Sequence, residues 1–187
     1  MRIVAGLAKG RRLAVPSQGT RPTSDRAREA LFNSLGTLLD LNDARVLDLF
    51  AGTGAVGLEA LSRGAVQAVF VESERAAGEV LRRNIETVGL PGAVLRRRPA
   101  AAYLAAAATP ATDGPFGLVF ADPPYALADD ALTALLTALV TNDWLADEAV
   151  LVVERSVRSP APDWPDAVEV WRNRRYGEGV LWYGRRR

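Results

Sequence analysis

The chain has 187 residues, of which 49% are hydrophobic and 24% charged, and a formal net charge of +1, which is typical of one globular domain. It contains no apolar run long enough to cross a bilayer and no N-terminal signal-peptide pattern, so we expect a cytosolic protein without a membrane partner. Cysteine and histidine are both absent, which excludes disulfides, thiolate nucleophiles, a histidine base and metal sites built on these ligands, so we expect no metal.

The first segment of the chain is short and basic. Residues 2–5 and 11–15 carry apolar side chains around two glycines, which predicts a β-hairpin or a loose arm over residues 1–20, followed by one domain over residues 21–187. Arginines also gather at the C-terminal end, over residues 172–187. Basic ends on a more acidic middle indicate a polyanionic partner, although ordinary solvated surface would look the same.

A helix is expected after Arg21-Pro22, which favours an extended backbone. Thr23, Ser24 or Asp25 can cap its N-terminus. Arg26 and Arg28 are expected to lie off its apolar face. That face consists of Ala27, Leu31, Leu35 and Leu38 or Leu39.

The central stretch is Val46 to Gly57, with the sequence VLDLFAGTGAVG. Its apolar run over 46–50 predicts a short buried parallel strand, and the helical pattern after it continues to about residue 63. Between them, Gly52 and Gly54 permit a tight turn and close approach of a ligand, and Gly57 lets the helix pack on the strand. A strand, a glycine turn and a helix in this order favour a nucleotide-containing cofactor. The alternative is a tight turn that serves packing alone.

Strands and helices then alternate to the end of the chain. Further strands are expected at residues 68–71, 93–95, 116–121 and 150–153, and helices over residues 76–88, 100–108 and 132–140. Three prolines exclude a regular helix over residues 156–165, and residues 168–171 and 180–183 alternate as an antiparallel pair. This order predicts an α/β fold with a doubly wound, Rossmann-like sheet, mostly parallel and with an antiparallel C-terminal edge.

Two acidic sites are expected beside the glycine turn. Glu72 ends the second strand, about 20 residues after the first glycine, where a carboxylate can accept hydrogen bonds from both ribose hydroxyls of a cofactor. Asp122-Pro123-Pro124-Tyr125 follows the strand over 116–121. Its prolines stiffen the loop and aim two acceptors, the Asp122 carboxylate and the Pro123 carbonyl, at one exocyclic amino group, while Tyr125 offers a face for a base to stack on. A solvated strand end and an ordinary turn are the plain alternatives.

The glycine turn together with DPPY resembles the amino-directed methyltransferases that use S-adenosylmethionine (SAM). More narrowly, RIVAG…KGRRL, RPTSDRAREALFN and LDLFAGTGAVGLEALSRGA resemble the bacterial 16S ribosomal RNA guanine-N(2) methyltransferase family. The resemblance implies a protein that acts on 16S rRNA, in the small subunit or its late precursor. Nothing in the sequence suggests more than a monomer. The resemblance also implies that the guanine is held by Asp122 to Tyr125. It further implies SAM contacts from Asp48, Ala51, Gly52, Thr53, Gly54, Glu72 and Thr23, and RNA contacts from Lys9, Arg11, Arg12, Arg21 and Arg26.

Several alternatives stay open at this point. Related enzymes often carry an acidic or amide residue after the third strand, but residues 96–100 read RRRPA, so the adenine contact of the cofactor is unassigned. Asp122 favours guanine, which presents adjacent N–H donors, over adenine, whose ring nitrogen would repel a carboxylate. The competing functions are an adenine-N(6) methyltransferase on DNA or RNA, an NAD-dependent oxidoreductase, and an RNA-binding module without activity.

Overall fold

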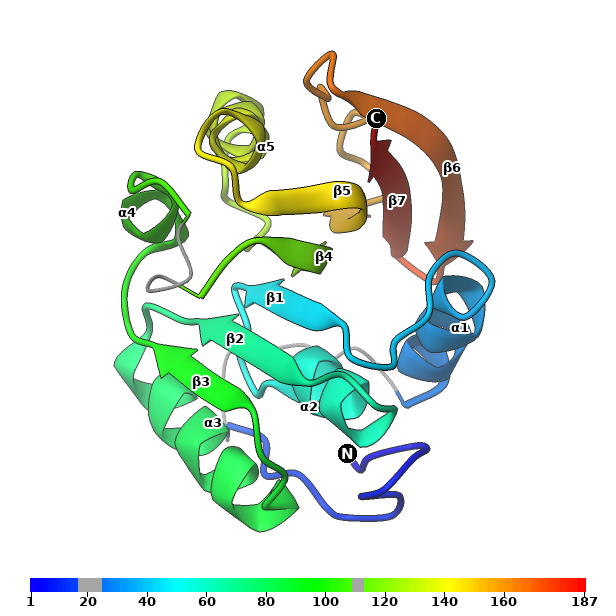
Figure 1. Cartoon of the computed structure of the whole chain (residues 1–187), viewed down its shortest axis with the longest axis vertical. Helices are drawn as coiled ribbons and strands as arrows, with labels where there is room; N and C mark the ends of the chain where they lie inside the picture. Colours follow the sequence, from blue (N-terminus) through cyan, green and yellow to red (C-terminus); the bar gives the residue numbers. More distant parts are fainter. Residues whose placement is uncertain (17–24, 109–112) are drawn as a thin grey trace.

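The computed structural model describes residues 1–16, 25–108 and 113–187, and its core is a seven-stranded sheet in the order β3-β2-β1-β4-β5-β7-β6 (Figure 1). The strands are β1 (Arg45–Leu49), β2 (Gln67–Val71), β3 (Ala93–Arg96), β4 (Phe116–Ala121), β5 (Leu145–Ser156), β6 (Val168–Tyr176) and β7 (Gly179–Arg186). The helices are α1 (Asp25–Leu35), α2 (Ala55–Ser62), α3 (Arg75–Val88), α4 (Ala100–Leu104) and α5 (Asp129–Thr141). Within the described ranges, no helix is both long and apolar enough to span a membrane.

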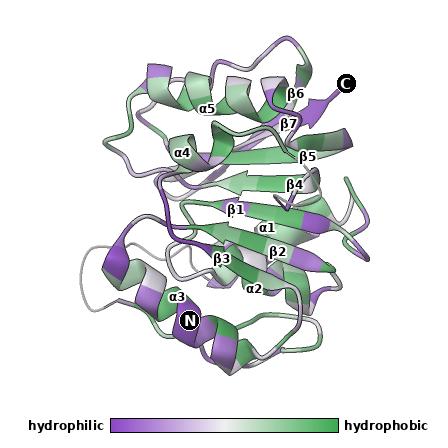
Figure 2. Cartoon of the chain, turned by 60° about the vertical axis from the view of Figure 1, so that its left-hand side comes forward, coloured by the Kyte–Doolittle hydropathy of each residue, from purple (hydrophilic) through white to green (hydrophobic). Residues whose placement is uncertain are grey.

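Helices cover both faces of this sheet. One apolar cluster joins Val46 of β1 to α1, α2 and α3, and a second joins Leu47 of β1 to α4 and α5. Successive side chains of a strand point to opposite faces, so a strand buried on both sides must be apolar almost throughout. Figure 2 shows these apolar strands between the helix layers and the hydrophilic outer side of α3.

The predicted α/β sheet is confirmed, including its antiparallel C-terminal edge. Strands β1 to β5 pair in parallel, and β7 is antiparallel to both β5 and β6. The prediction for β5 was too short, since the strand begins at Leu145 rather than at residue 150. Its early part contains Asp147 and Glu148, the latter with φ of 61°, and the pairing with β4 shifts register there. Because this first part of the strand is polar and irregular, a search for apolar runs in the sequence does not detect it.

One expectation for α1 was wrong. Arg28 was expected off the apolar face, but its side chain is fully buried. It lies one and two turns before Phe32 and Leu35, on the buried side of the helix. Its charge is matched there by Glu59 of α2, which is also fully buried, with 3.4 Å between Arg28 Nε and Glu59 Oε2. A partner on another element therefore allows an arginine on the core side.

The N-terminal segment folds back on itself and packs against the domain. The N–H of Ile3 donates to the carbonyl of Arg11 at 2.9 Å, and Arg2 and Arg12 form an isolated antiparallel bridge. At the turn of this hairpin, the N–H of Leu7 donates to the carbonyl of Ser62 at 2.7 Å. Ser62 is the last residue of α2, so the turn lies about 12 Å, the length of α2, from the helix start.

Candidate active site

Three neighbouring strands end at one level and bring the predicted residues to one edge of the sheet. Leu49 of β1 pairs with Val71 of β2 on one side and with Ala121 of β4 on the other. Glu72 and Asp122 are the residues that directly follow β2 and β4. They therefore flank the turn that follows β1, at the carboxyl edge where ligands of open α/β sheets bind.

The turn after β1 has an unusual backbone. Phe50, expected as the last strand residue, instead leaves the strand with φ of 61°, a left-handed conformation that is rare for a bulky residue. Gly52 and Gly54 follow with φ of 54° and 76°, and Gly54 caps the N-terminus of α2. The N–H of Ala51 donates to the carbonyl of Val71 at 3.0 Å, which holds the turn beside β2. No sequence signal marks Phe50, since an aromatic residue normally favours the strand.

The three glycines of the turn serve different purposes. A Cβ atom on Gly57 would stand 2.3 Å from the ring of Phe70, so this glycine allows α2 to lie close to β2. A Cβ atom on Gly54 would stand 2.2 Å from Leu81 of α3. We expected Gly54 to face a ligand, but the side on which it lacks a side chain faces the core. At Gly52 a Cβ atom would meet nothing closer than 4.0 Å. Gly52 is therefore the glycine with an open side.

The two carboxylates nearest the turn accept its backbone N–H groups. Asp48 is buried, and its Oδ2 accepts the N–H of Gly57 at 2.9 Å. The pKa of Asp48 is raised to about 8, mainly by burial and in small part by the charges of Asp122 and Glu72, against the lowering effect of that hydrogen bond. The Oε2 of Glu72 accepts the N–H of Gly52 at 2.8 Å. Its Oε1 accepts the N–H of Glu74 at 2.7 Å. A carboxylate has about four acceptor positions, so Glu72 keeps capacity for two hydroxyl groups.

The DPPY segment presents its polar and aromatic groups at the same edge. Asp122 is half-buried, and its N–H donates to the carbonyl of Leu49 at 3.4 Å. Burial raises the pKa of Asp122 to about 7, with a further contribution from the charge of Glu154. Pro123 is buried, whereas the side chain of Tyr125 is 69% exposed. The arrangement offers a carboxylate acceptor beside an aromatic ring that has a free face.

Sequence reasoning missed the support beneath this loop. Arg155 of β5 is buried, and its Nη2 lies 2.6 Å from Oδ1 of Asp129 at the start of α5. Both terminal nitrogens of Arg155 also lie 3.4 Å from the carbonyl of Leu127, just after DPPY. The apolar run over 150–153 stops short of Arg155, so no local pattern points to it.

A second missed residue connects the N-terminal segment to the glycine turn. Asn84 of α3 is buried, and its Oδ1 accepts the N–H of Ala14 at 2.8 Å. Its Nδ2 donates to the carbonyls of Ala14 at 3.0 Å and of Thr53 at 2.9 Å. Thr53 is itself a predicted cofactor contact. A single asparagine within a helical pattern is expected on the exposed side of the helix, so only the three-dimensional structure reveals this connection.

The predicted RNA contacts are spread over the N-terminal segment and α1. Lys9 and Arg26 line one cavity of about 330 Å³, together with the acidic Asp25 and Glu29. Arg11 donates to the carbonyl of Val88 at the end of α3. Arg12 is exposed. Arg21 and Thr23 lie outside the described residues.

The arginines after β3 are engaged by carboxylates. Arg96 forms a two-point ion pair with Asp113, at 2.7 and 2.8 Å, which raises the pKa of Arg96. Arg97 lies 2.8 Å from Glu79 of α3. The adenine contact of a cofactor therefore stays unassigned, as the sequence left it.

Comparison with known proteins identifies the group to which this arrangement belongs. The model of the family described as Conserved hypothetical protein 95 matches residues 1–185. The chain belongs to this family. It is 42% identical over 166 residues to Ribosomal RNA small subunit methyltransferase D of Escherichia coli K12, covering 88% of this chain and 79% of that protein. It is 37% identical to the putative rRNA methyltransferase YlbH of Bacillus subtilis, over the full length of both chains.

A solved structure shows the same fold within the family. The chain matches the putative methyltransferase yhhF from Escherichia coli with a TM-score of 0.86 at 39% identity, covering 100% of this chain and 97% of the other. These comparisons confirm the family that the motifs indicated, and the TM-score shows that the fold is shared over the whole chain.

Proposed function

We propose that the protein transfers a methyl group from SAM to the exocyclic N(2) amino group of a guanine in 16S rRNA. The observation that carries this proposal is the convergence of Asp48, Glu72 and Asp122 around the glycine turn, at the carboxyl edge of the sheet. The relatives named as ribosomal RNA methyltransferases support the reaction and the polymer.

The charge of the site favours SAM over a dinucleotide cofactor. The site gathers negative charge: the pKa of Asp48 is raised mainly by burial, and the neighbouring charges of Asp122 and Glu72 add to that rise. SAM carries a sulfonium and an ammonium cation, which would offset that negative charge, whereas a dinucleotide brings a negatively charged diphosphate. An oxidoreductase would also need an acid–base group such as histidine or a tyrosine–lysine pair, and the only lysine is Lys9 in the N-terminal segment.

The residues around the turn fit SAM. Glu72 would accept the ribose hydroxyls with its remaining lone pairs, and Gly52 leaves its open side to the ligand. SAM, when bound, supplies an electrophilic methyl group. Asp122 and the Pro123 carbonyl would accept N–H groups of the guanine and localise the lone pair of its amino nitrogen. Tyr125 would stack on the base, which must leave its helix to reach the site.

Guanine is favoured over adenine by the charge of Asp122. A carboxylate can accept two adjacent donors, the ring N–H and the amino N–H of guanine. At the corresponding ring position adenine presents an acceptor, which the carboxylate repels. We propose that the protein acts in the cytoplasm as a monomer, on an assembled small subunit or its late precursor.

The deciding experiment supplies SAM labelled on its methyl group to small subunits that lack the modification, followed by nucleoside analysis. Label in N(2)-methylguanosine is expected. Label in N(6)-methyladenosine, or no transfer by a protein shown to bind SAM, would overturn the proposal.

Variants of two aspartates connect the reaction to the DPPY segment. We expect Asp122→Asn to lose most of the transfer while retaining SAM binding. Asp130→Asn, an exposed aspartate in the first turn of α5, should keep full activity as the matched control. Full activity of Asp122→Asn on guanine would show that the charge of Asp122 is not required.

A further inference from the structure

The register of the sheet brings the hairpin between β6 and β7 to the same edge as Asp122. Ala121 of β4 pairs with Val153 of β5, so Asp122 and Glu154 stand at one level. Glu154 pairs with Leu181 of β7, and Leu181 pairs with Arg174 of β6. Arg174 therefore lies level with Asp122 across three strand spacings, about 14 Å at about 4.8 Å each.

Most of the other C-terminal arginines have structural partners. Arg172 donates to the carbonyl and the hydroxyl of Ser34 in α1, at 3.3 and 3.2 Å. Arg185 pairs with Glu148, and Arg186 donates to the carbonyl of Leu145 at the first residue of β5. These last two contacts lie at the opposite, amino edge of the sheet.

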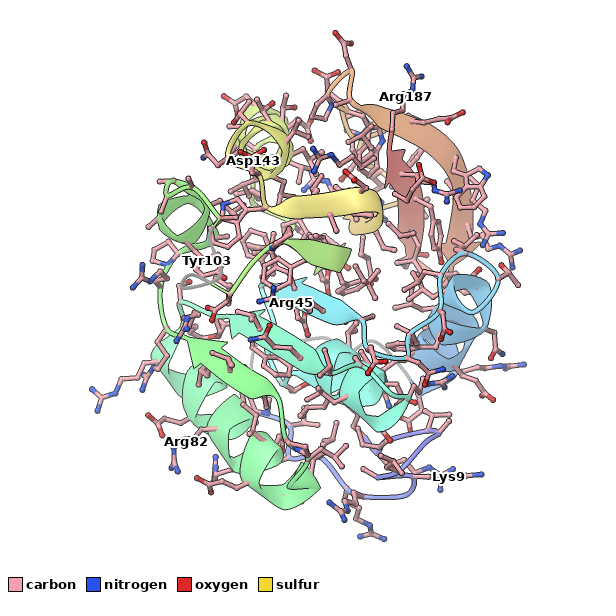
Figure 3. All side chains as sticks on the ribbon, in the orientation of Figure 1. Lys9, Arg45, Arg82, Tyr103, Asp143 and Arg187 are labelled. Atoms are coloured by element: carbon pink, nitrogen blue, oxygen red, sulfur yellow. The ribbon has the colours of Figure 1, made fainter. Side chains whose placement is uncertain are left out.

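Figure 3 shows that Arg187 lies near the opposite end of the molecule from Lys9 of the N-terminal segment. The basic chain ends therefore do not form one surface. The C-terminal arginines instead divide between the two edges of the sheet.

Three exposed arginines remain at the site edge, and we call them the hairpin-tip patch: Arg158, Arg174 and Arg175. Arg158 joins the hairpin because the N–H of the preceding residue, Val157, donates to the carbonyl of Glu178 at 2.9 Å. Among the residues that the structure describes, none of the three has a carboxylate within ion-pair distance. The Nε of Arg175 donates to the carbonyl of Gly177 at 3.0 Å, which is a neutral partner, so no described carboxylate competes with an external anion for these three guanidinium groups.

We propose that the hairpin-tip patch binds the phosphate backbone of the RNA next to the target guanine. The inference rests on the proposed function, because it assigns the partner of the same site. The planar guanidinium of arginine can donate two parallel hydrogen bonds to a phosphate, and it is more weakly hydrated than an ammonium group. The turn of the N-terminal hairpin lies at the other end of α2, where Lys9 shares its cavity with Asp25 and Glu29. The hairpin-tip patch is therefore better placed to contact nucleotides that flank a base held by DPPY.

The test compares Arg174→Gln with Arg187→Gln, an equal change of charge at an exposed arginine of the opposite edge. Binding of unmethylated small subunits is measured at several KCl concentrations, and methyl transfer is measured at saturating SAM. For Arg174→Gln we expect the slope of log K against log salt to become shallower by about 0.7, with a severalfold higher KM for the subunit. The affinity for SAM and the kcat at saturating subunit should not change.

The control decides the outcome. Arg187→Gln should keep the salt slope and the KM of the unmodified protein. If Arg174→Gln, and the double variant Arg174→Gln/Arg175→Gln, retain that slope while transferring methyl groups normally, the hairpin-tip patch is not an RNA contact. If Arg174→Gln makes the salt slope shallower as expected, but the unsubstituted protein never methylates guanine, the hairpin-tip patch stands as an RNA contact and the proposed reaction fails.

Discussion

Replacing Glu59 by glutamine should destabilise the protein strongly, because it leaves the buried charge of Arg28 without its fully buried partner. Glu59 accepts hydrogen bonds from the N–H groups of Val4 and Ala5 at 2.8 and 2.9 Å, and pairs with Arg28 and Arg63. Removing one partner of a buried ion pair costs about 3–5 kcal/mol. A second carboxylate, Asp25, remains 3.1 Å from Arg28 with its side chain 39% exposed, so we expect the lower end of that range, about 3 kcal/mol.

For a chain of this length, that loss of free energy of unfolding lowers the melting temperature by about 6–12 °C. Calorimetry and far-ultraviolet circular dichroism measure the shift. Hydrogen exchange should in addition show weaker protection of the Val4 and Ala5 amides, since both donate to Glu59.

Glu79→Gln is the matched control, because Glu79 also pairs with two arginines, Arg82 and Arg97, but its side chain is 43% exposed. Solvent screens such a pair, so its loss should barely move the melting temperature. A Glu59→Gln protein that melts no lower than Glu79→Gln would refute the reasoning about the buried pair.

Two further predictions concern the site. The raised pKa of Asp122, about 7, leaves this carboxyl group partly protonated at neutral pH, so kcat/KM for the RNA should rise with pH through that value. Asp122→Asn should lack this rise. A pH profile of initial rates tests the prediction, and the same pH dependence in the variant would contradict it. Asn84→Ala removes the hydrogen bonds that connect Ala14 to the glycine turn, so KM for SAM should rise severalfold with little change in kcat, measured well below the melting temperature. Asn33→Ala, at an exposed asparagine of α1, is the control, and an equal KM for SAM in both variants would exclude a positioning role for Asn84.

The parts of the fold that depend on local pattern could be predicted from the sequence. The apolar run of β1, the turn after it and the alternation of strands and helices each show in a few consecutive residues. Residues whose environment is set by distant partners could not be predicted. Arg28 is buried because of Glu59, which is 31 residues away, and Asn84 is placed by Ala14, which is 70 residues away. The direction in which Gly54 faces likewise depends on the packing of Leu81 from α3.

The outer strand β6 has no second pairing partner among the residues that the structure describes, and open edges invite the addition of strands from other copies of a chain. Val170 and Trp171 on this strand are 54% and 44% exposed, which would strengthen such an association. The strand is interrupted by a register shift between Val170 and Arg172, and Arg174 and Arg175 place like charges along its end. Charged side chains on an edge strand disfavour the addition of another strand. We therefore expect the arginines proposed to hold RNA to oppose aggregation as well, so that neutralising all of them should lower solubility as well as affinity.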